Sequence, residues 1–488
     1  MNSLTCGFVS RCALAAALAF SLSGAAVAAG LPQFDPGVLR PTREHGEYSP
    51  ALRGNWLLSG YGHLYRIRRG GADIYSHAGG LCWFDPIATP DADQLLAWYA
   101  RSWLRPDTAF ADSRDGMQYH IDPLAALPPA CTRPIDRTTP AYTFDAMANL
   151  FIDYFPYAAE RGVDFVRRKA QLRPLAAAAR DDAELAAVFA EFVAGFDDPH
   201  TGANVWVDGQ RIELGQQRGG PTIALLRERF AASGADDFDA WLAQWAADQN
   251  AKIDALLDPA TRRRVFGDSV AWGVLPDNIG YLAFDAMIFV ASNEADNRAA
   301  IRAELDAALT ALKDTRAIVV DVSANGGGIG MVSSDIAGRF ADRRRLAYTK
   351  QARGVRRAAP HAFHAIPSGA VRYAKPVVLL TSDLTVSAGE LFTLFMRALP
   401  QVVHVGTRTQ GAVSGAFPHG LPNGWEVGFP TEVTRDAQGR VYEATGIPPR
   451  TTFEVFPRDG FDDGRVDAIR RAAGIAAAQP ASGAAIGQ

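Results

Sequence analysis

Ser387 is a residue whose type and position in the sequence could support catalysis. It lies in the segment 385–390, which follows an expected buried strand and opens an expected helix. Free backbone N–H groups and the positive end of the helix dipole meet at such a position, so they would stabilise an oxyanion and an activated serine. Serine is also a preferred N-cap residue, and a purely structural role for Ser387 is the alternative.

Two further segments could assist a nucleophile. The turn 325–328 has the sequence Asn-Gly-Gly-Gly and follows an expected strand that ends at Asp321. Its glycines allow the backbone to approach a ligand and to aim N–H groups at it, and the alternative is a flexible connection. No Gly-Lys-Ser/Thr follows, so a phosphate loop is not indicated. His200, in the loop 198–201, is a candidate general base, although a single histidine is more often structural.

A β/α core must hold these residues in place. From residue 280, short apolar runs bounded by turns alternate with helical patterns, which is typical of buried parallel strands. The expected strands are 279–284, 317–322, 377–381 and 402–405, and the expected helices are 294–312, 332–340 and 387–399. We therefore place a catalytic β/α core at 271–455.

The rest of the chain divides into five parts. Residues 1–28 read as a signal peptide, and 30–135 as a partly β domain with a hairpin turn at Gly70-Gly71 and a short helix at 95–103. A helical segment over 136–203 carries His200. Residues 204–270 are predicted to be a helical insertion without strand alternation, and 456–488 a short helix and a tail.

Six motifs in a fixed order resemble those of one enzyme family. They are Asp-x-His-Thr at 198–201, Gly-Tyr-Leu-x-Phe at 280–284, Val-Val-Asp-Val-x-x-Asn-Gly-Gly-Gly at 319–328, Thr-x-Ser-Ala-x-Glu at 385–390, Gly-x-x-Thr-x-Gly at 406–411 and Glu-x-x-Gly-Ile-x-Pro from Glu443. The chain resembles the C-terminal processing peptidase and tricorn protease family of serine peptidases over about 140–450. This resemblance implies a crotonase-like (ClpP/crotonase-type) α/β fold preceded by a helical, lid-forming segment.

The resemblance also implies which residue acts as the base. Members with a Ser–Lys dyad carry the lysine directly after the Gly-x-x-Thr-x-Gly motif, but here Ala412 stands at that position and no lysine follows Lys375. Tricorn-like members instead pair the serine with a histidine of the Asp-x-His-Thr region, where this chain has His200. The resemblance therefore implies Ser387 as nucleophile and His200 as base.

Two carboxylates are candidates to support His200. The family's Glu-x-x-Gly glutamate corresponds to Glu443, which acts on the histidine in tricorn through a serine that directly precedes it. Here Pro199 replaces that serine, so a direct copy of the relay is not expected. Glu390, in the first turn of the expected helix, is the alternative carboxylate.

The expected reaction is acyl transfer to water. Ser387 attacks the scissile carbonyl, and His200 takes the serine proton and passes it to the leaving amine. The backbone N–H groups of Ala388 and of Gly326 or Gly327 are the expected oxyanion donors. No cofactor and no metal site are predicted.

Composition and charge restrict the partners. The chain has 488 residues, a net charge of −4, 48% hydrophobic and 21% charged residues, which excludes a disordered chain. A pI near 6.2 gives no basic surface for nucleic acid. We expect a peptide or protein substrate and no nucleic acid, and the sequence leaves the oligomeric state open.

The N-terminus predicts export. Arg11 supplies a positive charge, residues 13–27 are a short apolar run, and Ala26-Val27-Ala28 is a small-x-small cleavage site. The run is shorter than the ~18–20 residues of a spanning helix, so no stable membrane anchor is expected, and the protein should be periplasmic or secreted. Only Cys82 and Cys131 remain after cleavage, and they are predicted to form a disulfide, with two unrelated buried thiols as the alternative.

These observations predict an exported serine peptidase, either an endopeptidase or a carboxyl-terminal (tail-specific) processing enzyme. No Gly-rich carboxylate-binding loop of the PDZ type is visible in 204–270. The alternatives are a non-catalytic ligand- or peptide-binding protein on the same fold, as in the related interphotoreceptor retinoid-binding repeats, and a crotonase-type acyl-CoA enzyme, against which export argues.

Overall fold

The computed structural model describes residues 40–87, 102–103, 109–111, 117–216, 218–290, 294–355 and 360–480. The expected signal peptide lies outside these residues, and so does most of the helix expected at 95–103. The last two residues of that expected helix instead form strand β8, Ser102–Trp103. No helix in the described part is both long and apolar enough to cross a membrane.

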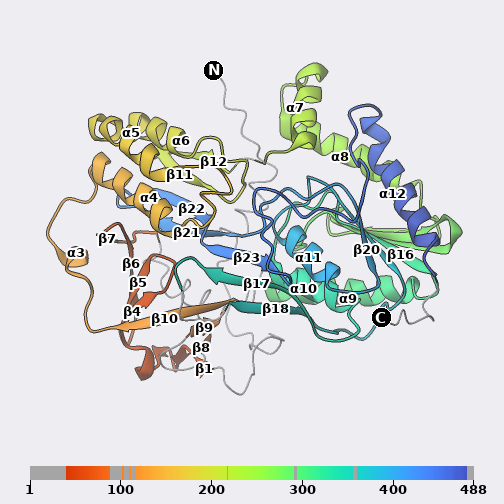
Figure 1. The fold of residues 1–488 in the computed structure, drawn as a ribbon, viewed down its shortest axis with the longest axis horizontal. Helices are drawn as coiled ribbons and strands as arrows, with labels where there is room; N and C mark the ends of the chain where they lie inside the picture. Colours follow the sequence, from red (N-terminus) through yellow and green to blue (C-terminus); the bar gives the residue numbers. More distant parts are fainter. Residues whose placement is uncertain are drawn as a thin grey trace.

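A seven-stranded sheet forms the centre of the α/β fold (Figure 1). Its strands, in spatial order, are β13 (Arg263–Val265), β14 (Val270–Leu275), β15 (Ile279–Phe284), β16 (Ala317–Asp321), β19 (Val377–Thr381), β20 (Val402–Gly406) and β24 (Thr451–Thr452). The strands from β15 to β24 run parallel, and every residue of β15, β16 and β19 is buried. Burial on both faces explains why these strands are continuous apolar runs in the sequence.

Helices cover both faces of this sheet. On one face lie α9 (Glu294–Ala311), α10 (Gly330–Gly338) and α11 (Ala388–Arg397), and on the other α12 (Phe461–Ala477), α7 (Pro221–Ser233) and α8 (Phe238–Asp254). Alternate strand residues pack on opposite faces: Val320 shares a core with α9–α11, and Val319 shares one with α12. In Figure 1, α8 and α12 lie above β16 and β20, and α9 and α10 lie below them. Strands β15, β16, β19 and β20 and helices α9, α10 and α11 begin and end within two residues of the predicted positions.

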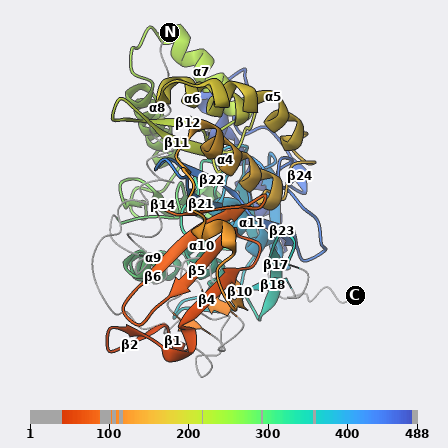
Figure 2. The same ribbon diagram turned by 90° about the vertical axis from the view of Figure 1, so that its left-hand side faces the viewer.

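An eight-stranded antiparallel sheet precedes the core and faces the viewer in Figure 2. Its strands, in spatial order, are β1 (Arg40–Pro41), β8, β9 (Ala109–Ala111), β10 (Gln118–Leu124), β4 (Gly54–Leu58), β5 (His63–Ile67), β6 (Ala72–Ala78) and β7 (Leu81–Phe84). The predicted hairpin at Gly70-Gly71 joins β5 to β6. Short elements η1 (Pro50–Leu52), β2 (Arg43–Glu44) and β3 (Glu47–Tyr48) lie at its start, and η2 (Pro276–Asn278) precedes β15.

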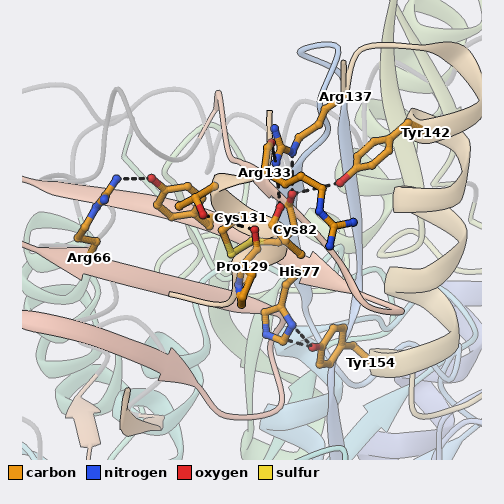
Figure 3. The surroundings of a disulfide bond; sticks show 12 residues. Arg66, His77, Cys82, Pro129, Cys131, Arg133, Arg137, Tyr142 and Tyr154 are labelled. Atoms are coloured by element: carbon orange, nitrogen blue, oxygen red, sulfur yellow. Dashed lines mark hydrogen bonds between the residues drawn. A yellow bond between two sulfur atoms is a disulfide. The ribbon is translucent and has the colours of Figure 1, made fainter. Parts of the chain in front are cut away.

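Cys82 of β7 and Cys131 of α3 (Pro129–Thr132) form a disulfide (Figure 3). The carbonyl oxygen of Cys82 also accepts hydrogen bonds from Arg137 Nε at 2.9 Å and from the Tyr142 hydroxyl at 3.1 Å. The disulfide and these two bonds together fasten the edge of the N-terminal sheet to the beginning of the helical segment that follows.

That helical segment consists of α4 (Pro140–Tyr154), α5 (Phe165–Ala178) and α6 (Asp182–Phe192), whose apolar faces share one core. It ends in the loop that carries His200, as the sequence predicts. The segment packs on a four-stranded sheet of β12 (Gln210–Gly215), β11 (Gly202–Val207), β22 (Glu426–Pro430) and β21 (Ala416–Gly420).

The prediction of a mostly helical insertion without strand alternation over 204–270 is wrong at both ends. Strands β11 and β12 form a hairpin, and residues 263–275 contribute β13 and β14 to the core sheet, so only α7 and α8 are helical. The hairpin turn is Asp208-Gly209, with positive φ at both residues (52° and 75°), and Asp-Gly is a common sequence for this turn. A three-stranded sheet of β18 (His361–Ala365), β17 (Arg345–Ala352) and β23 (Glu432–Asp436) was also not predicted.

Candidate active site

Ser387 occupies a strained turn between β19 and α11. It is the N-cap of α11 with φ 57° and ψ −121°, a conformation that residues other than glycine rarely adopt. Its N–H donates to the Ala412 carbonyl oxygen at 3.2 Å and to Glu390 Oε2 at 3.2 Å, and the preceding Val386 N–H donates to the Asn325 carbonyl oxygen at 3.0 Å. Surrounding segments thus hold the strained residue from several sides, as is common for nucleophilic serines that open a helix.

The structure brings His200 to Ser387. His200 Nε2 lies 3.1 Å from Ser387 Oγ, although the two residues are 187 positions apart. The His200 loop is fixed by Asp198, whose buried carboxylate accepts the His200 N–H at 2.9 Å and the Thr201 hydroxyl at 2.6 Å. The geometry suits transfer of the serine proton to the imidazole.

The surroundings of His200 favour its neutral form. Burial lowers the pKa of His200 below its usual value of 6.5, and the positive charges of Arg161 and Lys350 lower it further, whereas Asp198 and the backbone of Ser414 raise it. A protonated imidazolium cannot accept another proton, so only the neutral ring can act as a base for Ser387.

Asp198 is the carboxylate nearest to the free side of His200. Its Oδ1 lies 3.8 Å from His200 Nδ1, and Nδ1 makes no hydrogen bond within the described residues. If Nε2 accepts the serine proton, Nδ1 carries the ring N–H, and the Asp198 oxygen lies 3.8 Å from it. Asp198 is not among the predicted site residues, although it is the first residue of the Asp-x-His-Thr motif.

Glu443 is buried but does not hydrogen-bond His200. Its Oε1 accepts Arg161 Nη2 at 2.7 Å, and its Oε2 accepts the N–H groups of Val413 and Ser414 at 3.1 and 3.2 Å. Burial and the Asp198 carboxylate raise the pKa of Glu443 to about 8, against the opposing effect of Arg161. The structure therefore shows no direct contact by which Glu443 could give His200 the predicted support. Arg161 lies beside both Glu443 and Asp198.

Glu390 supports the turn of Ser387 rather than His200. One carboxylate oxygen accepts the Thr409 hydroxyl at 2.6 Å and the Gly411 N–H at 2.8 Å. The other accepts the N–H groups of Ala412 at 2.9 Å and Ser387 at 3.2 Å. Burial raises the pKa of Glu390 to about 7, although all these hydrogen bonds lower it. The alternative assignment of Glu390 as the partner of His200 finds no contact here.

The glycine turn lies directly beside Ser387, but its first N–H groups are engaged. Gly326 N–H donates to the Asp285 carbonyl oxygen and Gly327 N–H to Asn325 Oδ1, each at 2.9 Å. A Cβ atom on Gly327 would lie 2.7 Å from Ser387 Cβ, so the glycine is needed for this close approach. The prediction that Gly326 or Gly327 donates to an oxyanion is thus not met in this arrangement. Ala388 N–H makes no hydrogen bond within the described residues.

No lysine of the described residues hydrogen-bonds Ser387. Ala412, at the position where the resemblance would place a dyad lysine, is fully buried, and its N–H donates a hydrogen bond to Glu390 Oε2. Lys350 is buried but pairs with Glu432 Oε2 at 3.3 Å, and Lys375 Nζ donates to two backbone carbonyls. Among the nearby basic groups, His200 is the one in contact with the serine.

The part of the chain that carries Ser387 is similar to known peptidases. A family model described as peptidase family S41 matches residues 278–453, which include Ser387 and Glu443. No curated protein matches the chain. Among solved structures, a candidate peptidase from Parabacteroides merdae ATCC 43184 is 24% identical, with a TM-score of 0.53 over 71% of this chain and 99% of its own.

Two further solved structures are more distant. Mature CPAF in complex with lactacystin is 12% identical, with a TM-score of 0.47 over 70% of this chain and 98% of its own. The photosystem II D1 C-terminal processing protease is 15% identical, with a TM-score of 0.38 over 67% of this chain and 97% of its own. The protein described here is a peptidase of the serine type. This assignment follows from the match of residues 278–453 to the model of peptidase family S41.

Proposed function

We propose that the protein hydrolyses peptide bonds with Ser387 as the nucleophile and His200 as the general base. The observation that carries this proposal is the 3.1 Å contact between Ser387 Oγ and His200 Nε2 at the N-terminus of α11. A strained serine, a neutral buried imidazole and a helix N-terminus are the parts that acyl transfer to water needs.

The proposed reaction begins when Ser387 Oγ attacks the scissile carbonyl carbon and His200 Nε2 takes the hydroxyl proton. The Ala388 N–H and the N-terminus of α11 stabilise the oxyanion. His200 then protonates the leaving amine, and a water molecule hydrolyses the acyl-enzyme by the same route. Asp198 stabilises the imidazolium that forms in each step, because its carboxylate faces His200 Nδ1 at 3.8 Å.

We propose further that the core is of the crotonase type and that the helical segment before it acts as a lid. Parallel strands β15, β16, β19 and β20 with α9–α11 on one face support this assignment. The substrate is a peptide or protein, cut internally or near its carboxyl terminus. Products from a peptide with an amidated C-terminus distinguish these two modes, because only internal cleavage leaves the amidated end attached to a long fragment.

We propose that the chain is exported after cleavage behind Ala28. The short apolar run before this site and the Cys82–Cys131 disulfide support this, since disulfides persist in oxidising compartments. Mass spectrometry of the protein from the periplasm and medium should give a mature chain beginning at Ala29. A chain that keeps its first 28 residues in the cytoplasm would contradict the proposal.

Peptide hydrolysis by the purified mature protein tests the function. The wild type should cleave an unfolded protein substrate, and Ser387→Ala should abolish cleavage while the thermal unfolding midpoint stays close to the wild-type value. Ser233→Ala, at the end of α7, is the matched control and should keep full activity. Equal cleavage by wild type and Ser387→Ala would contradict the proposal and attribute the activity to a contaminant or to another residue.

A further inference from the structure

Arg161 is a buried cation at the centre of the site that the proposed reaction does not use. Its side chain is 7% exposed, and Nη2 contacts three groups from distant parts of the chain. It donates to Glu443 Oε1 at 2.7 Å and to the Gly411 carbonyl oxygen at 3.1 Å, and it lies 3.6 Å from Asp198 Oδ2. One guanidinium nitrogen thus joins the loop of His200 to the segments that flank Ser387.

The turn that carries Arg161 is itself firmly docked. Arg161 N–H donates to the Tyr157 carbonyl oxygen at 3.0 Å. The hydroxyl of Tyr157, which is buried, lies 2.8 Å from Ser414 Oγ and accepts the Thr434 N–H at 2.8 Å. Because Ser414 follows the loop that contacts Ser387, the turn after α4 holds this loop with both Tyr157 and Arg161.

The charges around Arg161 explain why a cation is needed there. Asp198, Glu443 and Glu390 are all buried, and each is close enough to raise the pKa of Arg161 against the effect of its burial. Without Arg161, Asp198 and Glu443 would be two buried carboxylates without a common cation, which is strongly unfavourable. Asp198 could then keep its charge only by turning away, and otherwise it would take up a proton and become neutral.

We propose that Arg161 is a positioning residue for the proposed Ser387–His200 reaction. Its guanidinium ties Asp198 to Glu443 and to the Gly411 carbonyl, and Asp198 in turn holds the His200 loop. Glu443 therefore acts on His200 through Arg161 and Asp198, in place of the serine relay that Pro199 excludes. This inference rests on the proposed function, because it assigns a role within that reaction.

Replacing Arg161 tests the inference by kinetics. Arg161→Met should lower kcat about 10- to 100-fold with KM little changed, because a displaced base misaligns the chemical step. The acid limb of the pH–kcat profile should move to higher pH, because Arg161 lowers the pKa of His200. Asp198 and Lys350 are the other charged groups near His200, and the substitution replaces neither of them. Arg161→Lys keeps the charge and should retain the wild-type position of the limb.

A charge-compensating pair and a matched control separate positioning from folding. Arg161→Met with Glu443→Gln should recover part of the kcat lost by Arg161→Met alone, because the unpaired carboxylate is removed. Arg168→Met removes another partly buried arginine, which donates only to the carbonyls of Phe192 and Ala194, so it should lower stability without moving the pH profile.

Titration of the His200 imidazole by NMR keeps this test independent of turnover. The His200 signal, assigned by its loss in His200→Ala, should titrate at higher pH in Arg161→Met than in the wild type. An unchanged His200 titration and an unchanged acid limb in folded Arg161→Met would overturn the inference. If the wild type shows no Ser387-dependent hydrolysis, the proposed function fails, and a shifted titration would then leave Arg161 as the group that sets the charge of His200.

Discussion

The Glu390 carboxylate supports the turn of Ser387. The Glu390 carboxylate accepts hydrogen bonds from Ser387 itself and from Thr409, Gly411 and Ala412, and so it joins the serine turn to the loop beside it. A glutamate at the third position of a helix often reaches back to the N-cap, and here the same group also organises a second loop. These hydrogen bonds stabilise the strained φ of Ser387.

We expect Glu390→Gln to lower both stability and activity. The amide presents N–H donors where the carboxylate accepted backbone N–H groups, which leaves buried donors facing one another and costs about 1–3 kcal/mol. Chemical denaturation and peptide hydrolysis measure the two effects. Glu304→Gln, where the carboxylate accepts a single bond from Trp272 Nε1 at 2.7 Å, is the control and should keep wild-type activity. Wild-type activity in Glu390→Gln would contradict this role.

At the scale of elements, the glycine turn and α11 form one unit. The turn places Gly327 against Ser387, and Asn325 binds both the Gly327 N–H and the Phe284 carbonyl oxygen, at 2.9 and 2.8 Å. Neighbouring parallel strands β15, β16 and β19 end beside each other, which brings these loops together. Loops at the carboxyl ends of parallel strands commonly form the functional site of an α/β sheet.

Two neighbouring glycines of this turn should respond differently to alanine. In Gly327→Ala the new Cβ would lie 2.7 Å from Ser387 Cβ, at a backbone φ of 89°, so we expect loss of most activity. In Gly326→Ala the nearest atoms lie at 4.0 Å, so folding and activity should be nearly unchanged. Hydrolysis rates of the two folded variants decide the matter, and equal rates would show that the close approach to Ser387 is unimportant.

The elements that could be predicted are those whose pattern reflects burial on both faces. The strands at 279–284 and 377–381 were predicted because they are continuous apolar runs between turns. The hairpin β11–β12 was missed even though its Asp208-Gly209 turn is visible in the sequence, because the surrounding composition was read as helical. Strand β17 is only partly buried, and buried and exposed residues alternate irregularly from Arg345 to Ala352. Its sequence therefore shows only a weak two-residue hydrophobic period.

The candidate site was predictable only where a motif carries the residue. Ser387 and His200 follow from motifs, whereas Arg161 lies in an ordinary turn, and its contact with Glu443 spans 282 residues. No local pattern records a contact of that range. Asp198 is part of the Asp-x-His-Thr motif, but its role depends on the position of the His200 ring, which only the three-dimensional structure provides.

At the scale of the whole molecule, the N-terminal sheet meets the β21–β22 sheet through buried polar groups. His63 Nε2 lies 3.7 Å from Asp85 Oδ2, and the rings of His63 and His419 are 4.7 Å apart between centroids. The Asp85 carboxylate also accepts the Ser76 hydroxyl and the Gly420 N–H, each at 2.9 Å. These contacts join segments more than 300 residues apart.

This interface predicts a loss of stability in acid. Burial lowers the pKa of His63 to about 4, so between pH 6.5 and pH 4 the unfolded chain takes up a proton that the folded chain does not. The stability present above pH 6.5 should therefore fall as the pH drops, by about 3 kcal/mol for this group alone. Denaturant unfolding at several pH values measures this fall.

The matched variants identify the group responsible. His63→Gln should flatten the dependence of unfolding free energy on pH, whereas His364→Gln, at a more exposed position, should change it little. An identical slope in the wild type and in His63→Gln would show that His63 does not remain neutral in the folded protein.

The central claim is that Ser387 is a nucleophile activated by His200, and labelling with a fluorophosphonate tests it most directly. We expect one probe per wild-type chain, and peptide mass spectrometry should locate it on Ser387. The labelling rate should fall as the pH drops through the pKa of His200, which lies below 6.5. His200→Ala should slow labelling by about 100- to 10,000-fold, and the control His364→Ala should not. Labelling of folded His200→Ala at the wild-type rate, or attachment of the probe to another residue, would contradict the account.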